Sequence, residues 1–206
     1  MRANTNLRAL ILWAAPIFAA TAASAAITPI GQFTGQYQES FDNFSFNWTS
    51  GSVPVFSGLA SVHERSNGSI IVTNSWSFNT IVSPKDGTKF MGSPSSWVQY
   101  DFNIPVIAFG GFFTTNTTTS NGQVQFFLNG QLLSTQSLAA PKTGEWTWNG
   151  WSSPTGFDSV RVISNFSSGG FIMQDSLQAT SIPVPGTAAA CGLVLLASLR
   201  RRSRAA

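Results

Sequence analysis

At 206 residues the chain has room for one domain of ordinary size with short targeting segments. Only 9% of its residues are charged, against about 25% in typical soluble proteins. The formal charge of +3 comes from the two ends, because residues 26–180 hold five basic and eight acidic side chains, a net charge of −3. Without a basic stripe to neutralise phosphates, nucleic-acid binding is excluded.

The first 25 residues have the three-part layout of a secretory signal peptide. Arg2 and Arg8 precede an apolar stretch over 9–20, and the small residues Ala23-Ser24-Ala25 follow. This spacing predicts cleavage after Ala25, so that the mature chain begins at Ala26. An uncleaved amphipathic or membrane helix is the alternative, although the apolar stretch is short for a span of about 20 residues. We therefore expect an exported protein.

Short strand patterns recur through residues 26–180. The β-branched run 69–73 follows a turn, and in 97–103 (WVQYDFN) Val98, Tyr100 and Phe102 alternate with Trp97, Gln99 and Asp101. Pro105 is expected to break this strand, and Gly110-Gly111 indicates a bulge or bend in the next one. Two apolar runs flank Asn129-Gly130, the favoured pair for a type I′ hairpin turn. Further strands are expected over 157–166, with Arg161 facing away from Val160 and Val162, and over 169–180.

The spacing of these strands predicts the fold class. About eight to ten short strands separated by turn residues are typical of a sandwich or barrel. Nothing supplies the crossover helices of a parallel α/β fold, which is therefore excluded. We expect one all-β domain over 26–180, an antiparallel β-sandwich of the jelly-roll type.

Three tryptophans lie within six residues: Trp146, Trp148 and Trp151. On a strand, Trp146 and Trp148 share a face. If exposed, these rings suit the C–H faces of sugars, with Glu145 and Asn149 bonding hydroxyls. The alternative is packing between the sheets, since tryptophan is highly buried on average. The sequence thus leaves two alternatives for these tryptophans, a glycan-binding platform or packing in the hydrophobic core.

The sequence shows no catalytic constellation and predicts no cofactor. It holds a single histidine, His63, and a single cysteine, Cys191, so a metal site of thiolates or several imidazoles is excluded. A Ser-His-Asp triad is formally open, but no nucleophile-elbow motif is present and His63 is expected at the surface. Calcium binding is also open, without the spacing of an EF-hand; the candidates are Asp42, Asp86, Asp101, Asp158 and Asp175. Of these, Asp158 is expected to cap a turn and Asp175 to be structural.

The C-terminal 26 residues, 181–206, look like a targeting segment. Pro183-Val184-Pro185 is followed by 14 apolar or small residues, Gly186 to Leu199, which include Cys191. As a helix this run spans about 21 Å, and snorkelling arginines can extend it towards the bilayer thickness. The basic cluster at its end would stay cytoplasmic; its members are Arg200, Arg201, Arg202 and Arg204. A short transmembrane helix is expected here.

Proline motif, apolar helix and terminal arginines together resemble the PEP-CTERM sorting signal of bacterial surface proteins, with the motif at Pro183, Val184, Pro185 and Gly186. The family has Pro-Glu-Pro where this chain has Pro-Val-Pro, so the tail is either a variant of the signal or a plain stop-transfer anchor. The order of strands also resembles the β-sandwich bodies that precede such tails, through Ile104–Gly111 and Gly156–Val160. The resemblance implies an exported, membrane-tethered protein processed by an exosortase near Pro183.

The resemblance also implies a role. We expect a non-enzymatic protein of the cell surface or extracellular matrix that contacts exopolysaccharide. The alternative is a secreted glycan-active hydrolase, which would need two carboxylates flanking a cleft. The eight acidic residues are few and scattered, which favours the first reading.

Overall fold

The computed structural model describes residues 26–45, 48–65, 68–78, 80–92, 97–116, 121–164 and 171–182. These residues form antiparallel β-sheet with one 3-10 turn, η1 (Phe56–Gly58), and no α-helix, which confirms the predicted all-β class. In chain order the strands are β1 (Thr28–Pro29), β2 (Tyr37–Glu39), β3 (Trp48–Ser50), β4 (Val53–Val55), β5 (Ala60–Glu64), β6 (Ser69–Thr73), β7 (Trp76–Phe78), β8 (Thr80–Val82), β9 (Phe90–Gly92), β10 (Trp97–Thr115), β11 (Asn121–Leu128), β12 (Gln131–Ala139), β13 (Thr147–Ile163) and β14 (Ile172–Ser181).

The predicted targeting segments fall outside this description. The signal peptide, with Ala23 and Ala25, and the sorting tail from Pro183 onward lie beyond the described residues. Ala26, the expected first residue of the mature chain, is exposed at the start of the β domain. Within the part of the chain that is described, no helix has the length and apolar character to cross a bilayer.

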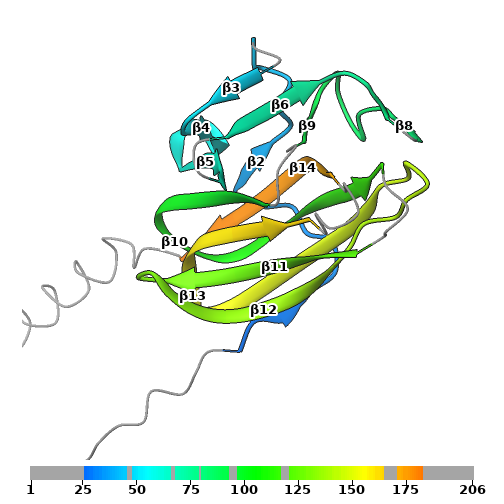
Figure 1. Ribbon diagram of the computed structural model, residues 1–206. Coiled ribbons are helices and arrows are strands. Elements are labelled where there is room, and N and C mark those ends of the chain that lie inside the picture. The colour runs from blue at the N-terminus through cyan, green and yellow to red at the C-terminus, as the bar shows by residue number, and fades with distance from the viewer. Residues whose placement is uncertain are drawn as a thin grey trace, which may run out of the picture.

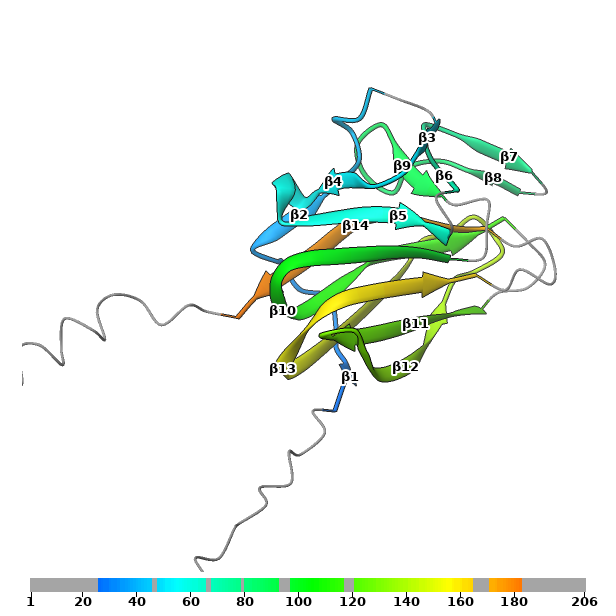
Figure 2. The same cartoon turned by 60° about the vertical axis from the view of Figure 1, so that its left-hand side comes forward.

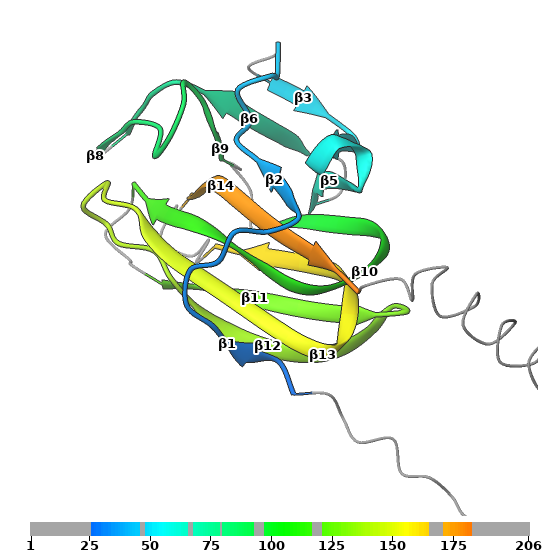
Figure 3. The same cartoon turned by 180° about the vertical axis from the view of Figure 1, so that it is seen from behind.

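The strands lie in two layers, consistent with the predicted sandwich (Figure 1). The front sheet has the order β4-β5-β10-β13-β11-β12, seen from top to bottom in Figure 2. The back sheet has β1-β13-β10-β14, and β14 then pairs with both β2 and β9, as the view from behind shows (Figure 3). β9, β6 and β3 continue this layer, and β7 and β8 form a separate hairpin.

β10 and β13 belong to both layers because each bends. β10 pairs with β5 up to Phe102 and with β14 from Val106 onward, and its register with β13 shifts between Asp101 and Val106. The prediction that Pro105 ends the strand is wrong. Pro105 lies in the bend, where ladder pairing is interrupted and its missing N–H costs nothing. Gly156 of β13, with φ of +78°, lies beside the same bend.

The predicted hairpin turn is confirmed, and the irregularity predicted at Gly110-Gly111 is a bulge whose extra residue lies on the partner strand β14. Asn129 and Gly130 both have positive φ, 51° and 75°, as a type I′ turn requires, and they join β11 to β12. The register of β10 with β14 shifts between Gly110 and Phe112. The extra residue lies on β14, where Ser176 has φ of +50°, and a side chain on Gly111 would collide with Leu177, 2.3 Å from its Cβ position.

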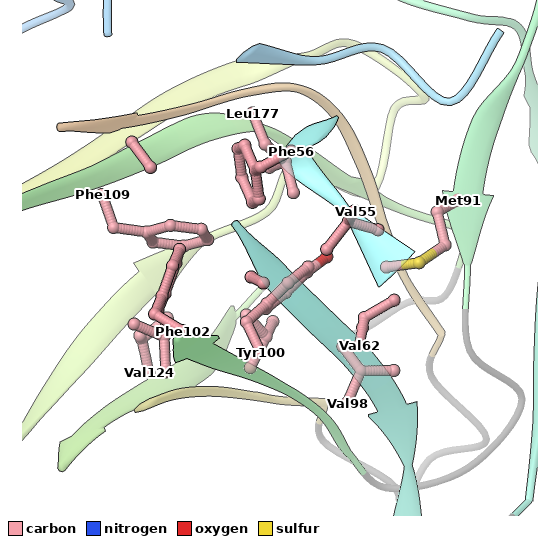
Figure 4. Close-up of a cluster of buried hydrophobic side chains, with 14 of the residues drawn as sticks. Val55, Phe56, Val62, Met91, Val98, Tyr100, Phe102, Phe109, Val124 and Leu177 are labelled. Carbon is pink, nitrogen blue, oxygen red and sulfur yellow. The ribbon is translucent and has the colours of Figure 1, made fainter. Parts of the chain in front are cut away.

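The core between the layers combines aliphatic side chains with a cluster of aromatic rings (Figure 4). Phe56, Tyr100 and Phe109 are each at most 1% exposed, and their ring centroids lie 5.5 to 6.5 Å apart. Such contacts add about 0.5–1.5 kcal/mol per pair beyond area burial. The Tyr100 hydroxyl donates to Oε1 of Gln174 at 2.9 Å, and burial raises the pKa of Tyr100 well above its ordinary value.

Candidate functional site on the front sheet

The outward face of the front sheet carries an ordered row of polar side chains. Since side chains alternate along a strand, burying Val98 and Tyr100 in β10 turns Trp97, Gln99 and Asp101 outward, as the sequence predicted. The strand registers then place five residues side by side across the sheet. From β5 to β12 this row is His63, Gln99, Arg161, Gln125 and Thr135.

Arg161 is the centre of this face. Its guanidinium carbon lies 4.5 Å from the ring centroid of Trp97 and 4.9 Å from that of Phe127, so the cation contacts two aromatic rings. Its Nε and Nη2 both donate to Oε1 of Gln99, at 3.0 and 2.7 Å. Partial burial lowers the pKa of Arg161, and the charge of Asp101 opposes this shift. The guanidinium still carries its charge at neutral pH.

A hydrogen-bonded chain extends from Arg161 to the β5 side of the sheet. Nε2 of Gln99 donates to Oδ1 of Asp101 at 2.8 Å, and Oδ2 of Asp101 lies 3.3 Å from Nδ1 of His63. The His63 ring meets the Trp97 ring edge-on at 5.9 Å. The side chains of His63 and Asp101 are 26% and 43% exposed, so the chain is open to a ligand. We call the outward side chains of His63, Trp97, Gln99, Asp101, Phe127 and Arg161 the Arg161 face.

A hollow of about 360 Å³ opens on the Arg161 face. Asp158 lies at its rim, where Oδ2 accepts the backbone N–H of Asn129 at 2.7 Å, which confirms its predicted role in supporting a turn. Ser159 is 8% exposed, and its hydroxyl has no hydrogen-bond partner among the described residues. The hollow is lined by Gln99, Asp101, Phe102, Phe127, Gly130, Asp158, Ser159 and Arg161.

A second hollow, of about 660 Å³, lies at the other end of the same strands. Gln123 and Phe127, which line the two hollows, are separated by four residues of β11, or about 13 Å. The front sheet therefore offers an elongated surface with a depression at each end. The second hollow is lined by Gly122, Gln123, Ser137, Leu138, Ala139, Asn149, Ile163 and Ser164.

The three clustered tryptophans do not form one platform. Trp151 is 2% exposed and packs in the core, so it is not available to a ligand. Trp148 lies on the back sheet, with Phe33 and Phe112 edge-on to it at 5.6 and 5.4 Å. Trp146 precedes β13, donates its Nε1–H to the Ser83 carbonyl and packs against the separate cluster around Phe90.

The polar partners proposed for that platform also differ from expectation. Asn149 is committed to the structure, because its Oδ1 accepts the N–H of Ala139 and its Nδ2 donates to the Ala139 carbonyl, at 2.9 and 2.8 Å. Glu145 is exposed beside the tryptophans. The three tryptophans of this segment therefore lie in three different environments and do not share a ligand surface with Glu145 and Asn149.

Asp42 and Asp175, like Asp158, accept backbone N–H groups rather than forming a calcium site. Oδ1 of Asp42 accepts from the N–H groups of Thr88 and Lys89, and these bonds help to lower the pKa of Asp42. Asp175, 0% exposed, accepts the N–H of Lys85 at 2.7 Å and that of Asp86 at 3.3 Å. Among the described residues no three His, Cys, Asp or Glu side chains come together as a metal site.

His63 lies next to a carboxylate, as a catalytic dyad would require, but no serine that the structure describes completes a triad with it. Its Nδ1 faces Asp101, and no serine hydroxyl bonds its Nε2 in the part of the chain described by the structure.

The comparisons with known proteins add little to this geometry. No protein-family model and no curated protein matches the sequence. Similar solved structures include a family 6 carbohydrate-binding module from Clostridium cellulolyticum in complex with xylose (15% identity, TM-score 0.35, 69% of this chain and 95% of that chain). Another is a family 29 carbohydrate-binding module from Piromyces equi (11%, TM-score 0.34, 77% and 93%).

A third similar structure is a glycoside hydrolase family 43 arabinoxylan arabinofuranohydrolase from Bacillus subtilis in complex with cellotetraose (16%, TM-score 0.39, 55% of this chain). The chain spans about a quarter of the length of that hydrolase, 24%. Because the TM-scores are below 0.5, these similarities say nothing about the ligand or the activity of this chain. The function proposed below is argued from the side chains of the Arg161 face.

Proposed function

We propose that residues 26–180 form a non-enzymatic, glycan-contacting domain of an exported cell-surface or matrix protein, and that the Arg161 face is its contact surface. The observation that carries the proposal is the row of fixed donors and acceptors between two aromatic rings. A pyranose presents an apolar C–H face and a rim of hydroxyls. Trp97 and Phe127 suit the first, while Gln99, Asp101 and Arg161 suit the second.

The two ends of the chain bear on where the protein acts. We propose export through the signal peptide over 1–25, tethering by the apolar helix within 186–199, and processing by an exosortase-type enzyme near Pro183. The support is the layout of both ends of the sequence together with its uncharged polar surface. A partner polymer in the exopolysaccharide of the cell would then lie within reach of the tethered domain.

The competing function, a glycan-active hydrolase, is favoured by one observation: Asp101 and Asp158 line the same hollow. Both carboxylates are already engaged, Asp101 with Gln99 and His63, and Asp158 with the Asn129 amide. Polysaccharide turnover that disappears in Asp101→Asn or Asp158→Asn protein would establish the hydrolase instead.

A glycan array probed with the full chain, purified in detergent, tests the proposal. The variants are Trp97→Ala, on the Arg161 face, and Trp148→Ala, a matched tryptophan on the back sheet. We expect Trp97→Ala to lose binding and Trp148→Ala to keep it, with thermal unfolding showing that both variants remain folded. The reverse pattern would move the contact surface to the back sheet.

A further inference from the structure

Arg161 keeps its charge without a carboxylate in contact. Arg161 forms no ion pair with a described residue, and its hydrogen bonds go to Gln99, a neutral amide. Partly burying a guanidinium is unfavourable unless its charge is compensated. The two aromatic rings and Gln99 compensate part of this cost, and the position remains open to an anion.

The guanidinium is also oriented. Nε and Nη2 face Gln99 on β10, while Nη1 has no hydrogen-bond partner among the described residues. Contact with Trp97 and Phe127 restricts rotation of the guanidinium plane. The edge formed by Nη1 and the second Nη2 hydrogen is therefore held in one orientation and is a fork for a planar partner.

Two parallel N–H donors on a fixed fork match a carboxylate better than a hydroxyl. On the β11 side the cross-strand neighbours of Arg161 are Gln125 and then Thr135, both neutral. Asp101 lies two residues from Gln99 on β10, opposite Ser159, and engages Gln99 and His63. Asp158, which lines the same hollow, accepts the N–H of Asn129. No carboxylate in this row neutralises the Nη1 edge of Arg161, which can therefore accept a carboxylate of the ligand.

We propose that the glycan bound by the Arg161 face is a uronate-containing polymer, whose carboxylate is held bidentately by the free edge of the Arg161 guanidinium. This inference rests on the proposed function and names its ligand class. Neutral sugars in the same chain would stack on Trp97 and Phe127. The net charge of −3 over residues 26–180 opposes an acidic polymer, so binding of a uronate depends on the contact with Arg161.

The experiment compares ligands that differ only in the carboxyl group. Polygalacturonate is set against its methyl ester, and alginate against its propylene glycol ester, in binding assays with the full chain. The variants are Arg161→Gln, which removes the charge, Arg161→Lys, which keeps the charge without the fork, and Lys85→Gln, which removes a charge near Phe112 on the back sheet.

We expect the wild type to bind at least one free polyuronate and to lose this binding on esterification. Arg161→Gln should weaken binding about ten- to a hundredfold, Arg161→Lys should weaken it less, and Lys85→Gln should bind as the wild type. Equal loss in Arg161→Gln and Lys85→Gln would overturn the inference in favour of general charge attraction.

Failure of the inference and failure of the proposed function are distinguishable. Binding to esterified or neutral polymers that Trp97→Ala abolishes and Arg161→Gln leaves unchanged would keep the proposed function and overturn the carboxylate contact. Binding to dextran sulfate alone would assign the fork to sulfate esters and likewise overturn it. Binding to no polymer in either assay would overturn both.

Discussion

Asp175 makes the stability of the fold depend on pH in an unusual direction. It is fully buried, and burial raises its pKa from 3.8 to about 7, although the N–H groups of Lys85, Asp86 and Ser176 oppose the shift. The folded protein therefore binds a proton that the unfolded chain releases between these two values. This contribution to stability is fully present below the unfolded pKa and is lost as pH rises through the folded pKa.

The magnitude follows from the shift of about three pKa units. At about 1.4 kcal/mol per unit the full effect is ~4 kcal/mol, and between about pH 5.5 and pH 8.5 the linkage relation gives a loss of about 2 kcal/mol. The pKa of Asp42 is lowered, so its opposite contribution is lost only below its ordinary value and lies outside this window.

Chemical denaturation from about pH 5.5 to pH 8.5, on the wild type and Asp175→Asn, measures the effect. The introduced carboxamide cannot titrate, and its NH₂ group faces backbone donors, so the variant should be about 1–3 kcal/mol less stable at acid pH. Its deficit should shrink by about 2 kcal/mol at alkaline pH. If the wild type is as stable at the alkaline end as at the acid end, Asp175 is ionised throughout and the reasoning is wrong.

Three further substitutions test the turn, the core and the site. Gly130→Ala meets no atom within 4 Å and only forces alanine to φ of +75°, so it should cost about 1–2 kcal/mol in denaturation experiments; no loss would refute the positive-φ turn. Tyr100→Phe removes the bond to Gln174 and should cost about 1–3 kcal/mol, whereas an unchanged denaturation midpoint would show that water replaces it. Gln99→Glu supplies Arg161 with an internal carboxylate and should weaken polygalacturonate binding about tenfold without unfolding the domain; undiminished binding in calorimetry would exclude the fork.

The features that could be predicted from the sequence are local ones, namely the inward and outward faces of a strand and the position of a tight turn. Alternation in β10 correctly separated Val98 and Tyr100 from Trp97 and Gln99, and Asn129-Gly130 correctly located the hairpin. The candidate site could not be found in this way, because Arg161 meets Gln99 across 62 residues of chain. That contact is set by the register of two long strands, which local patterns do not determine.

The clustered tryptophans show the same limit. Their spacing left open a glycan platform or packing between the sheets. In the structure Trp146 precedes β13, Trp148 faces outward on the back sheet and Trp151 points into the core. Pro105 was misinterpreted because a strand that changes sheets can place a proline where no ladder bond is needed. The sequence did contain one signal of the candidate site. Alternation in two predicted strands placed Trp97 and Gln99 on the outward face of one, and Arg161 on the face of the other that is turned away from Val160.

The bonds of Asn149 bear on how copies of the domain behave when crowded. β12 ends the front sheet and has no charged residue over Gln131–Ala139, so it lacks the charges that commonly keep edge strands apart. The carboxamide of Asn149 imitates a peptide group and satisfies both backbone groups of Ala139. Asn149 thereby occupies the backbone groups at one end of this edge strand, so that a strand of another copy cannot pair with Ala139.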